Sequence, residues 1–368
     1  MNLELSEEQE QLASGLRELL VGSGDIARVR EFAYEGGGRD TALWEQLVKN
    51  GWTSAALPES AGGLGLGFEE AMVIAIETGR CVLHLPLCET LLASRAAGRA
   101  SGHAGQGLLG EIAEGAGVTL AVGPSAGGIN DADDGVRASG DGQLSGTLRS
   151  VPFGPLAARC LVEAELDKGG TGLFALACDT AGVEWQERQA IDESVPRFDL
   201  ALRGATAASL FGDADAQSEV DRVCDEWRVL LAAQSEGACR RLVEMTADYV
   251  KKREQFGRPV GSNQAVKVRV AEMAAAVEKM RAAIYFAALA VERESEERAL
   301  AVAIAKVETG VPGGFVASQA IHTHGAIGYT WEQDVHLFVK RVKSNELLLG
   351  AGHEMLERIA DIVVDGAP

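Results

Sequence analysis

Two long amphipathic patterns, separated by a short cationic connection, constrain the fold of this 368-residue chain most strongly. Before Arg253 the apolar residues recur at mostly helical spacing, and after Gln264 they alternate steps of four and three. The second pattern is typical of the seam of an antiparallel helix bundle. Its members are Val266, Val270, Met273, Val277, Met280, Ile284, Ala287 and Val291. We therefore expect two long bundle helices, joined by a tight turn in which Gly257 and Pro259 end the first helix.

The connection carries side chains that suit a dinucleotide. An arginine such as Arg253 can clamp a phosphate, Phe256 can stack on a flat ring, and a glutamine can hydrogen-bond an amide-like edge. The same residues also have a structural explanation, because an arginine at a helix C-terminus complements the helix dipole and a phenylalanine there plugs the turn. The residue types alone leave both interpretations open.

The segment from Arg253 to Gln264 resembles the flavin-binding signature R-x-Q-F-G-R-P-V-x-x-x-Q of the acyl-CoA dehydrogenase family. This resemblance implies that Arg253, Gln255, Phe256 and Gln264 reach across a subunit interface and hold the ADP half of the neighbour's FAD. Further along, residues 319–330 resemble the family's Q-x-x-G-G-x-G-Y segment. The second resemblance adds three residues to the expected cofactor-binding set: His322 at the position of Gln, Gly325, and Ala326 at the second Gly.

Composition excludes several classes of function. The formal net charge of −20 argues against nucleic acid, because a phosphate-tracking surface needs clustered Lys and Arg. No run approaches 18 uncharged apolar residues and the first residues form no targeting segment, so we expect a cytoplasmic protein without a membrane span. The six cysteines show no C-x-x-C spacing, which predicts reduced core thiols and neither disulfides nor zinc.

The pattern predicts an α+β fold, mainly α, in three domains. Residues 1–116 form a helical domain that begins with a Ser6/Gln9 capping box and has a second helix from about Asp40. Residues 117–213 form a middle β-sheet domain of short strands, and residues 214–368 form an antiparallel four-helix bundle. Within the bundle, the segment 312–314 (Pro-Gly-Gly) predicts a break in the last helix but one.

Two other features could indicate ligand sites. The Gly-rich loop 57–67 lacks the G-K-S/T ending of a phosphate loop and no strand precedes it, which favours a structural role; it also resembles the P-E-x-x-G-G-x-G loop of the same family. His322, His324 and His336 could be metal ligands, but no clustered carboxylate or cysteine completes a site. We therefore expect no metal.

The chain departs from the family's sequence pattern at the positions that are expected to contact the flavin and to supply the catalytic base. Val122 stands at the position of Thr in the T-E-P-x-A-G-S-D flavin loop, and Gly128-Ile129 replaces its Ser-Asp. In the family the base is a Glu at one of two positions, and counting without gaps places Leu349 and Trp227 there. Neither side chain accepts a proton. Ala351 also lacks the hydroxyl of the family's Thr.

These departures favour a non-catalytic subunit of a heteromeric acyl-CoA dehydrogenase, similar to the paired subunits of actinobacterial steroid side-chain degradation. It would lend FAD contacts to a catalytic partner subunit that acts on an acyl-CoA. One alternative is an active homomeric enzyme that uses Glu226, Glu346 or Glu354 as a displaced base. Another is a flavin-free scaffold with the same fold. The expected assembly is an α2β2 heterotetramer.

Overall fold

The computed structural model describes residues 4–23, 26–36, 38–123, 135–212 and 215–366. Its contacts divide the chain into two compact units. The first comprises Met1–Val29, Met72–Leu83 and Arg228–Pro368, and the second comprises Arg30–Ala71 and His84–Trp227. The three domain boundaries expected from the sequence stay a prediction.

Helices precede the sheet, and their ends follow local capping. Ser6 and Gln9 exchange side-chain to backbone hydrogen bonds at 3.2 Å, which is the predicted capping box, and Asp40 accepts from the Leu43 amide at 3.0 Å. The elements are α1 (Glu7–Ser23), α2 (Ile26–Val29), η1 (Arg30–Tyr34), α3 (Thr41–Lys49), η2 (Glu59–Ala61), α4 (Phe68–Arg80), α5 (Leu87–Arg99) and α6 (His103–Ala113).

The Gly-rich loop has a structural role. Gly62 and Gly65 have φ of 83° and 63°, and a Cβ on Gly63 would lie 2.2 Å from the Leu57 carbonyl oxygen. Only glycine fits this close return of the backbone.

A seven-stranded sheet forms the β part of the second unit. Strand β4 pairs with β2 and β5, and further pairing through β3 and β7 closes a ring whose inward side chains make one apolar cluster. The strands are β1 (Val118–Ala121), β2 (Gly135–Ala138), β3 (Gln143–Pro152), β4 (Arg159–Leu166), β5 (Thr171–Ala177), β6 (Val183–Arg188) and β7 (Arg197–Phe211), with η3 (Gly154–Leu156) after β3. The strands predicted for the middle of the chain are present.

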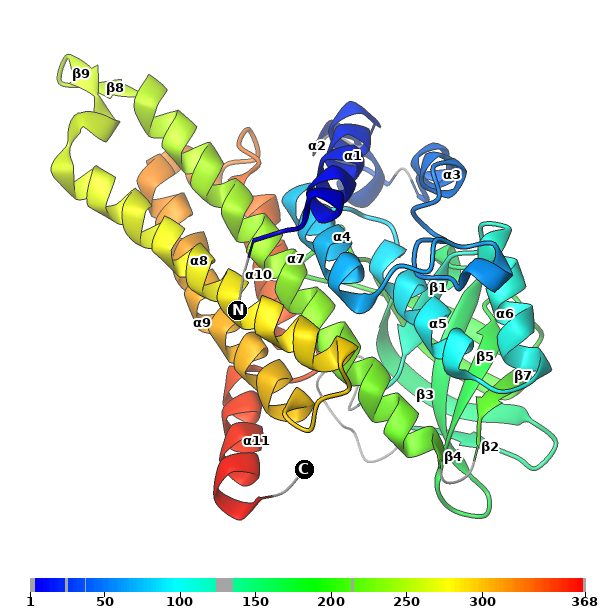
Figure 1. The fold of residues 1–368 in the computed structure, drawn as a ribbon. Helices are drawn as coiled ribbons and strands as arrows, with labels where there is room; N and C mark the ends of the chain where they lie inside the picture. The colour runs from blue at the N-terminus through cyan, green and yellow to red at the C-terminus, as the bar shows by residue number, and fades with distance from the viewer. Residues whose placement is uncertain (1–3, 24–25, 37, 124–134, 213–214, 367–368) are drawn as a thin grey trace. The chain divides into compact units, whose positions relative to one another are not determined.

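The C-terminal part is the predicted helical bundle. Its long helices α7, α8 and α9 run side by side in Figure 1, with a small hairpin where α7 passes into α8. The predicted seam residues from Met273 to Val291 are buried in α8. The elements are α7 (Ala216–Lys252), β8 (Glu254–Gln255), β9 (Arg258–Pro259), η5 (Val260–Ser262), α8 (Gln264–Glu292), α9 (Arg298–His324), η6 (Gly325–Tyr329), α10 (Val335–Leu347) and α11 (Gly352–Asp365).

The predicted break at residues 312–314 is wrong, because α9 continues through Pro312 to His324. Four helices meet at Gly313: a Cβ there would contact Val342 of α10 at 3.1 Å, and Cys239 of α7 and Met280 of α8 at 3.7 Å. Burial of this crowded position in the bundle outweighs the hydrogen bond that a proline removes.

Helix α9 is also long and apolar enough to cross a membrane by composition, although half of its most apolar stretch is buried inside the structure. The core helix of a bundle has the same properties.

Candidate functional site

The connection after α7 is a two-stranded hairpin. Gln255 pairs with Arg258, and the two residues between them have φ of 54° (Phe256) and 75° (Gly257). Positive φ at both central residues is characteristic of a type I′ turn, whose twist suits a tight hairpin. Phe256 adopts a left-handed conformation that costs a non-glycine residue about 1 kcal/mol or more, and its side chain is fully exposed.

The hairpin ends where α8 begins. Asn263 caps that helix by accepting from the Ala265 amide at 3.1 Å, and the first helical residue, Gln264, is exposed. The Val260 amide donates to the Arg253 carbonyl at 2.8 Å, which ties the two sides of the connection together.

A hollow of about 300 Å³ lies beside this connection, within the first unit. It brings together three of the predicted cofactor-binding residues: Arg253, Gln255 and His322. The other lining residues are Tyr249, Val260, Val266, Arg269 and Thr323. Both resembling segments therefore contribute to one hollow although about 70 residues separate them.

The other four predicted residues lie outside the lining of this hollow. Phe256 is at the tip of the hairpin and Gln264 at the start of α8. Gly325 and Ala326 are exposed residues of η6, directly after α9.

The hollow is cationic in an acidic protein. Among the described residues, the side chains of Arg253 and Arg269 have no hydrogen-bond or ion-pair partner, whereas Arg80 on the same unit pairs with Glu244 at 2.9 Å. No Asp or Glu is among the lining residues. The Thr323 Oγ1 atom is buried and also lacks a partner. Two guanidinium groups without such partners are suited to an anion with several oxygens.

The end of α9 is held rigidly beside the hollow. The Tyr249 hydroxyl donates to the His324 carbonyl at 3.2 Å, and the two rings stack with centroids 4.5 Å apart. Burial lowers the pKa of His324, whose Nδ1 faces the Ala320 carbonyl at 2.8 Å. Gly328 allows η6 to fold back, because a Cβ there would lie 2.8 Å from the Ile321 carbonyl oxygen.

Leu349, at the first expected base position, is 2% exposed and has φ of 58°. Arg228 holds its loop by donating to the Leu349 carbonyl at 2.9 Å, and Lys306 donates to the Asn345 and Leu348 carbonyls at 2.6 and 2.9 Å. Burial, with a smaller contribution from Arg228, lowers the pKa of Lys306 to about 7. The loop is thus fixed through its backbone, while its side chain at this position is apolar.

Trp227, at the second expected base position, is the largest fully buried side chain among the described residues. Its indole nitrogen is buried without a hydrogen-bond partner among them. An indole is a donor only, so it cannot take a proton from carbon.

The neighbouring Glu226 is buried and paired in the second unit. Its Oε1 lies 3.2 Å from Arg95 Nε and 3.0 Å from Arg99 Nη1, and Arg99 also pairs with Glu219 at 2.5 Å. Two guanidinium groups therefore already use this carboxylate.

The two other displaced-base candidates are also engaged. Glu346 Oε2 lies 2.9 Å from Lys343 Nζ, and Glu354 Oε2 accepts from the Ala351 amide at 2.7 Å. Glu354 thereby caps α11, a common role for a carboxylate in a first helical turn.

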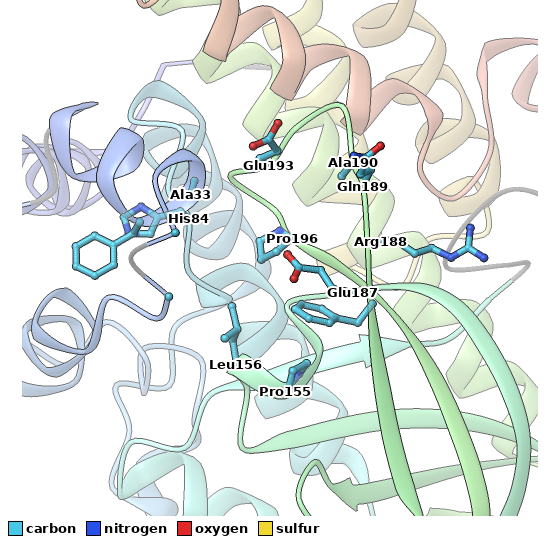
Figure 2. A pocket seen from close by; sticks show the side chains of 14 residues that line it. Ala33, His84, Pro155, Leu156, Glu187, Arg188, Gln189, Ala190, Glu193 and Pro196 are labelled. Atoms are coloured by element: carbon cyan, nitrogen blue, oxygen red, sulfur yellow. The ribbon is translucent and has the colours of Figure 1, made fainter.

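A second, larger hollow of about 930 Å³ lies in the second unit. Figure 2 shows Glu187 and Glu193 on the side of β6 and the following loop, and His84 on the helical side. His84 stacks on Phe32 with centroids 5.8 Å apart and lies 3.3 Å from Asp40. None of the predicted cofactor-binding residues lines it.

The remaining expectations concern metal, thiols and the flavin loop. In the described ranges no group of three or more His, Cys, Asp or Glu could hold a metal. All six cysteines are free thiols. Val122 is buried at the end of β1, whereas Gly128 and Ile129 lie outside the described residues.

Arg269, Tyr249 and Thr323 also line the hollow but were not predicted to bind the cofactor. Arg269 follows the signature by five residues, one and a half helical turns into α8, so its spacing from Val266 could have placed it on the same face. Thr323 lies beside His322 in the second resembling segment, but the resemblance gave it no role.

Two family models match the chain: the acyl-CoA dehydrogenase N-terminal domain over residues 6–100 and the C-terminal domain over residues 221–364. The chain is 30% identical to acyl-CoA dehydrogenase FadE27 of Mycobacterium tuberculosis over 337 residues, which covers 87% of each protein.

Two solved structures are similar over nearly their full length. The first is a Tcur3481-Tcur3483 steroid ACAD variant, with 31% identity, a TM-score of 0.88 and 98% of each chain covered. The second is the ChsE4-ChsE5 complex from Mycobacterium tuberculosis, with 27% identity, a TM-score of 0.89 and 100% of each chain covered. Together with the matched domains and the mainly helical fold around a sheet, these likenesses show that the chain belongs to the acyl-CoA dehydrogenase family.

Proposed function

We propose that this chain is the non-catalytic subunit of a heteromeric, FAD-dependent acyl-CoA dehydrogenase. The observation that carries the proposal is a contrast within the chain. Apolar or donor-only side chains, Leu349 and Trp227, occupy both expected base positions, while Arg253 and Arg269 line a cationic hollow and have no side-chain partner among the described residues. The chain thus keeps the cationic hollow that it would lend to a partner, and it lacks the catalytic base that an active site of its own would need.

The proposed dehydrogenation requires both a flavin site and a catalytic base. Desaturation of a thioester between its α and β carbons needs a hydride acceptor and a carboxylate that takes the α-proton. FAD supplies the hydride acceptor when it is bound. Leu349 offers no proton acceptor, so the partner subunit has to supply the base.

This chain's own contribution would be to bind the ADP half of the partner's FAD. Arg253 and His322 offer hydrogen-bond donors to phosphate or adenine, and the exposed ring of Phe256 offers a stacking face. The Arg253 guanidinium group, which has no partner in the part of the chain that the structure describes, fits an anionic group of this kind.

The names of two similar structures support a heteromeric assembly. Each names two proteins, Tcur3481 with Tcur3483 and ChsE4 with ChsE5, and the first is described as a steroid ACAD. On this basis we extend the proposal to an α2β2 heterotetramer acting on a steroid-type acyl-CoA.

An active homomeric enzyme with a displaced base is less consistent with the contacts. Glu226 is taken by Arg95 and Arg99, and Glu346 and Glu354 are engaged in a surface ion pair and a helix cap. A base that already serves two guanidinium groups is poorly placed to take a proton from carbon.

The test is to assay acyl-CoA dehydrogenase activity of the chain purified alone and after co-expression with a genomic neighbour of the same family. We expect negligible turnover by the chain alone, because loss of a positioned base typically costs about 10² to 10⁴ in rate, and turnover by the co-purified complex. Robust activity of the chain alone would contradict the proposal.

A further inference from the structure

Arg269 is an unpaired cation in an unusual place. It lies on α8, is half buried, and has no hydrogen-bond or ion-pair partner within the described part of the chain. The protein has 54 acidic and 34 basic residues, so most arginines can find a carboxylate. On the same unit, Arg80 pairs with Glu244 and Arg240 pairs with Glu236.

Arg269 shares its hollow with Arg253. The two residues come from different elements, the hairpin after α7 and the second turn of α8, and no carboxylate lies between them in the lining. Holding two like charges in one hollow is unfavourable unless an anion binds between them. The nearby N-terminus of α8 adds a positive helix dipole.

We infer that Arg269 is a second phosphate-binding residue, which forms with Arg253 a clamp for the pyrophosphate of FAD. The inference rests on the proposed function, since it assumes that the Arg253 hollow receives the ADP half of FAD. Two planar guanidinium forks match two adjacent phosphates, whereas one fork is sufficient for a single phosphate. Thr323 lines the same hollow, and its buried Oγ1 has no hydrogen-bond partner within the described part of the chain.

The clamp gives the site a preference that one arginine alone does not give. It binds a pyrophosphate, as in FAD or ADP, more tightly than a monophosphate, as in FMN or AMP. Arg269 acts on the cofactor and not on the reacting carbons, so its effect is measured through flavin binding.

The experiment uses the co-expressed complex after removal of its flavin. FAD is titrated while flavin fluorescence is followed, for the wild type and for the Arg269→Gln, Arg253→Gln and Lys267→Gln variants. Lys267 is the matched control, because it is an exposed cation on α8 two residues before Arg269 and does not line the hollow. ADP and AMP are then compared as competitors of FAD.

We expect Arg269→Gln to raise the Kd for FAD about tenfold or more, as the loss of a charge-assisted contact does, and Lys267→Gln to leave it unchanged. Arg269→Lys, which keeps the charge without the fork, should fall between them and serves if the Gln variant does not fold. In the wild type ADP should compete better than AMP, and Arg269→Gln should reduce that difference.

Two outcomes separate the inference from the proposed function. If Arg253→Gln weakens FAD binding and Arg269→Gln behaves like Lys267→Gln, the clamp is wrong and the proposed function stands. If neither arginine affects FAD binding, the proposed function fails. Equal competition by ADP and AMP in the wild type would overturn the assignment to pyrophosphate.

Discussion

At the scale of residues, the ion pairs of Glu226 bear on whether it could replace the carboxylate that is missing at residue 227. A carboxylate one position away on a helix is turned by about 100°, which agrees with its pairing to Arg95 and Arg99. Glu226 is then a structural residue that neutralises two partly buried cations.

A substitution of Glu226 tests this interpretation. Glu226→Gln removes the carboxylate charge that faces Arg95 and Arg99, although Arg99 keeps its pair with Glu219, so we expect the free energy of unfolding to fall by at most about 3 to 5 kcal/mol. The matched control is Glu111→Gln, because Glu111 pairs with Arg159 at a more exposed site, where the loss should be at most about 1 kcal/mol. Urea denaturation measures both. Equal stability of Glu226→Gln and the wild type would free Glu226 for chemistry and revive the displaced base.

The residue scale also shows what the sequence could predict. Arg253, Gln255 and His322 were predicted from the resemblance, and the structure brings them into one hollow. The spacing of Arg269 from Val266 could have placed it on the same face of α8, but the sequence does not indicate that its guanidinium group stays without a carboxylate there. Which charged side chains stay unpaired depends on tertiary contacts.

At the scale of elements, glycines determine how closely α4 and α7 cross. A Cβ on Gly237 of α7 would lie 1.9 Å from the Ile76 carbonyl oxygen, and a Cβ on Gly79 of α4 would lie 2.0 Å from the Gln234 carbonyl oxygen. The two backbones therefore touch where a glycine of each helix faces the other.

The prediction at this scale compares two glycines within helices. Gly237→Ala has to push α4 and α7 apart, and we expect the free energy of unfolding to fall by about 1 to 3 kcal/mol. Gly314→Ala in α9 meets nothing within 4 Å, so the better helix propensity of alanine should raise stability by about 0.5 to 1 kcal/mol. Thermal or urea denaturation measures the two changes. Stabilisation by both substitutions would show that α4 and α7 do not cross so closely.

The sequence predicted several elements correctly, but it also predicted a helix break that the structure does not contain. The capping box at Ser6, the cap at Asp40 and the seam of α8 are local or periodic signals, and each predicted its element correctly. Pro312 also predicted a local effect, but the packing of four helices around Gly313 keeps α9 continuous. At this position tertiary packing therefore outweighs the helix-breaking propensity of proline.

At the scale of the whole molecule, the proposed division of labour sets the number of flavins. Each competent site would combine a catalytic partner with this chain's Arg253 hollow, while Val122, Leu349 and Ala351 leave this chain's own flavin side without the family's Thr and Glu groups. In an assembly with paired, symmetry-related interfaces, half of the chains would then carry a flavin.

The most direct test is the flavin content of the co-purified complex, measured as flavin absorbance against protein mass. The proposal predicts about one FAD per pair of unlike subunits, because only one of the two chains provides a complete catalytic face. One FAD per polypeptide would contradict it, since this chain would then have a flavin site of its own.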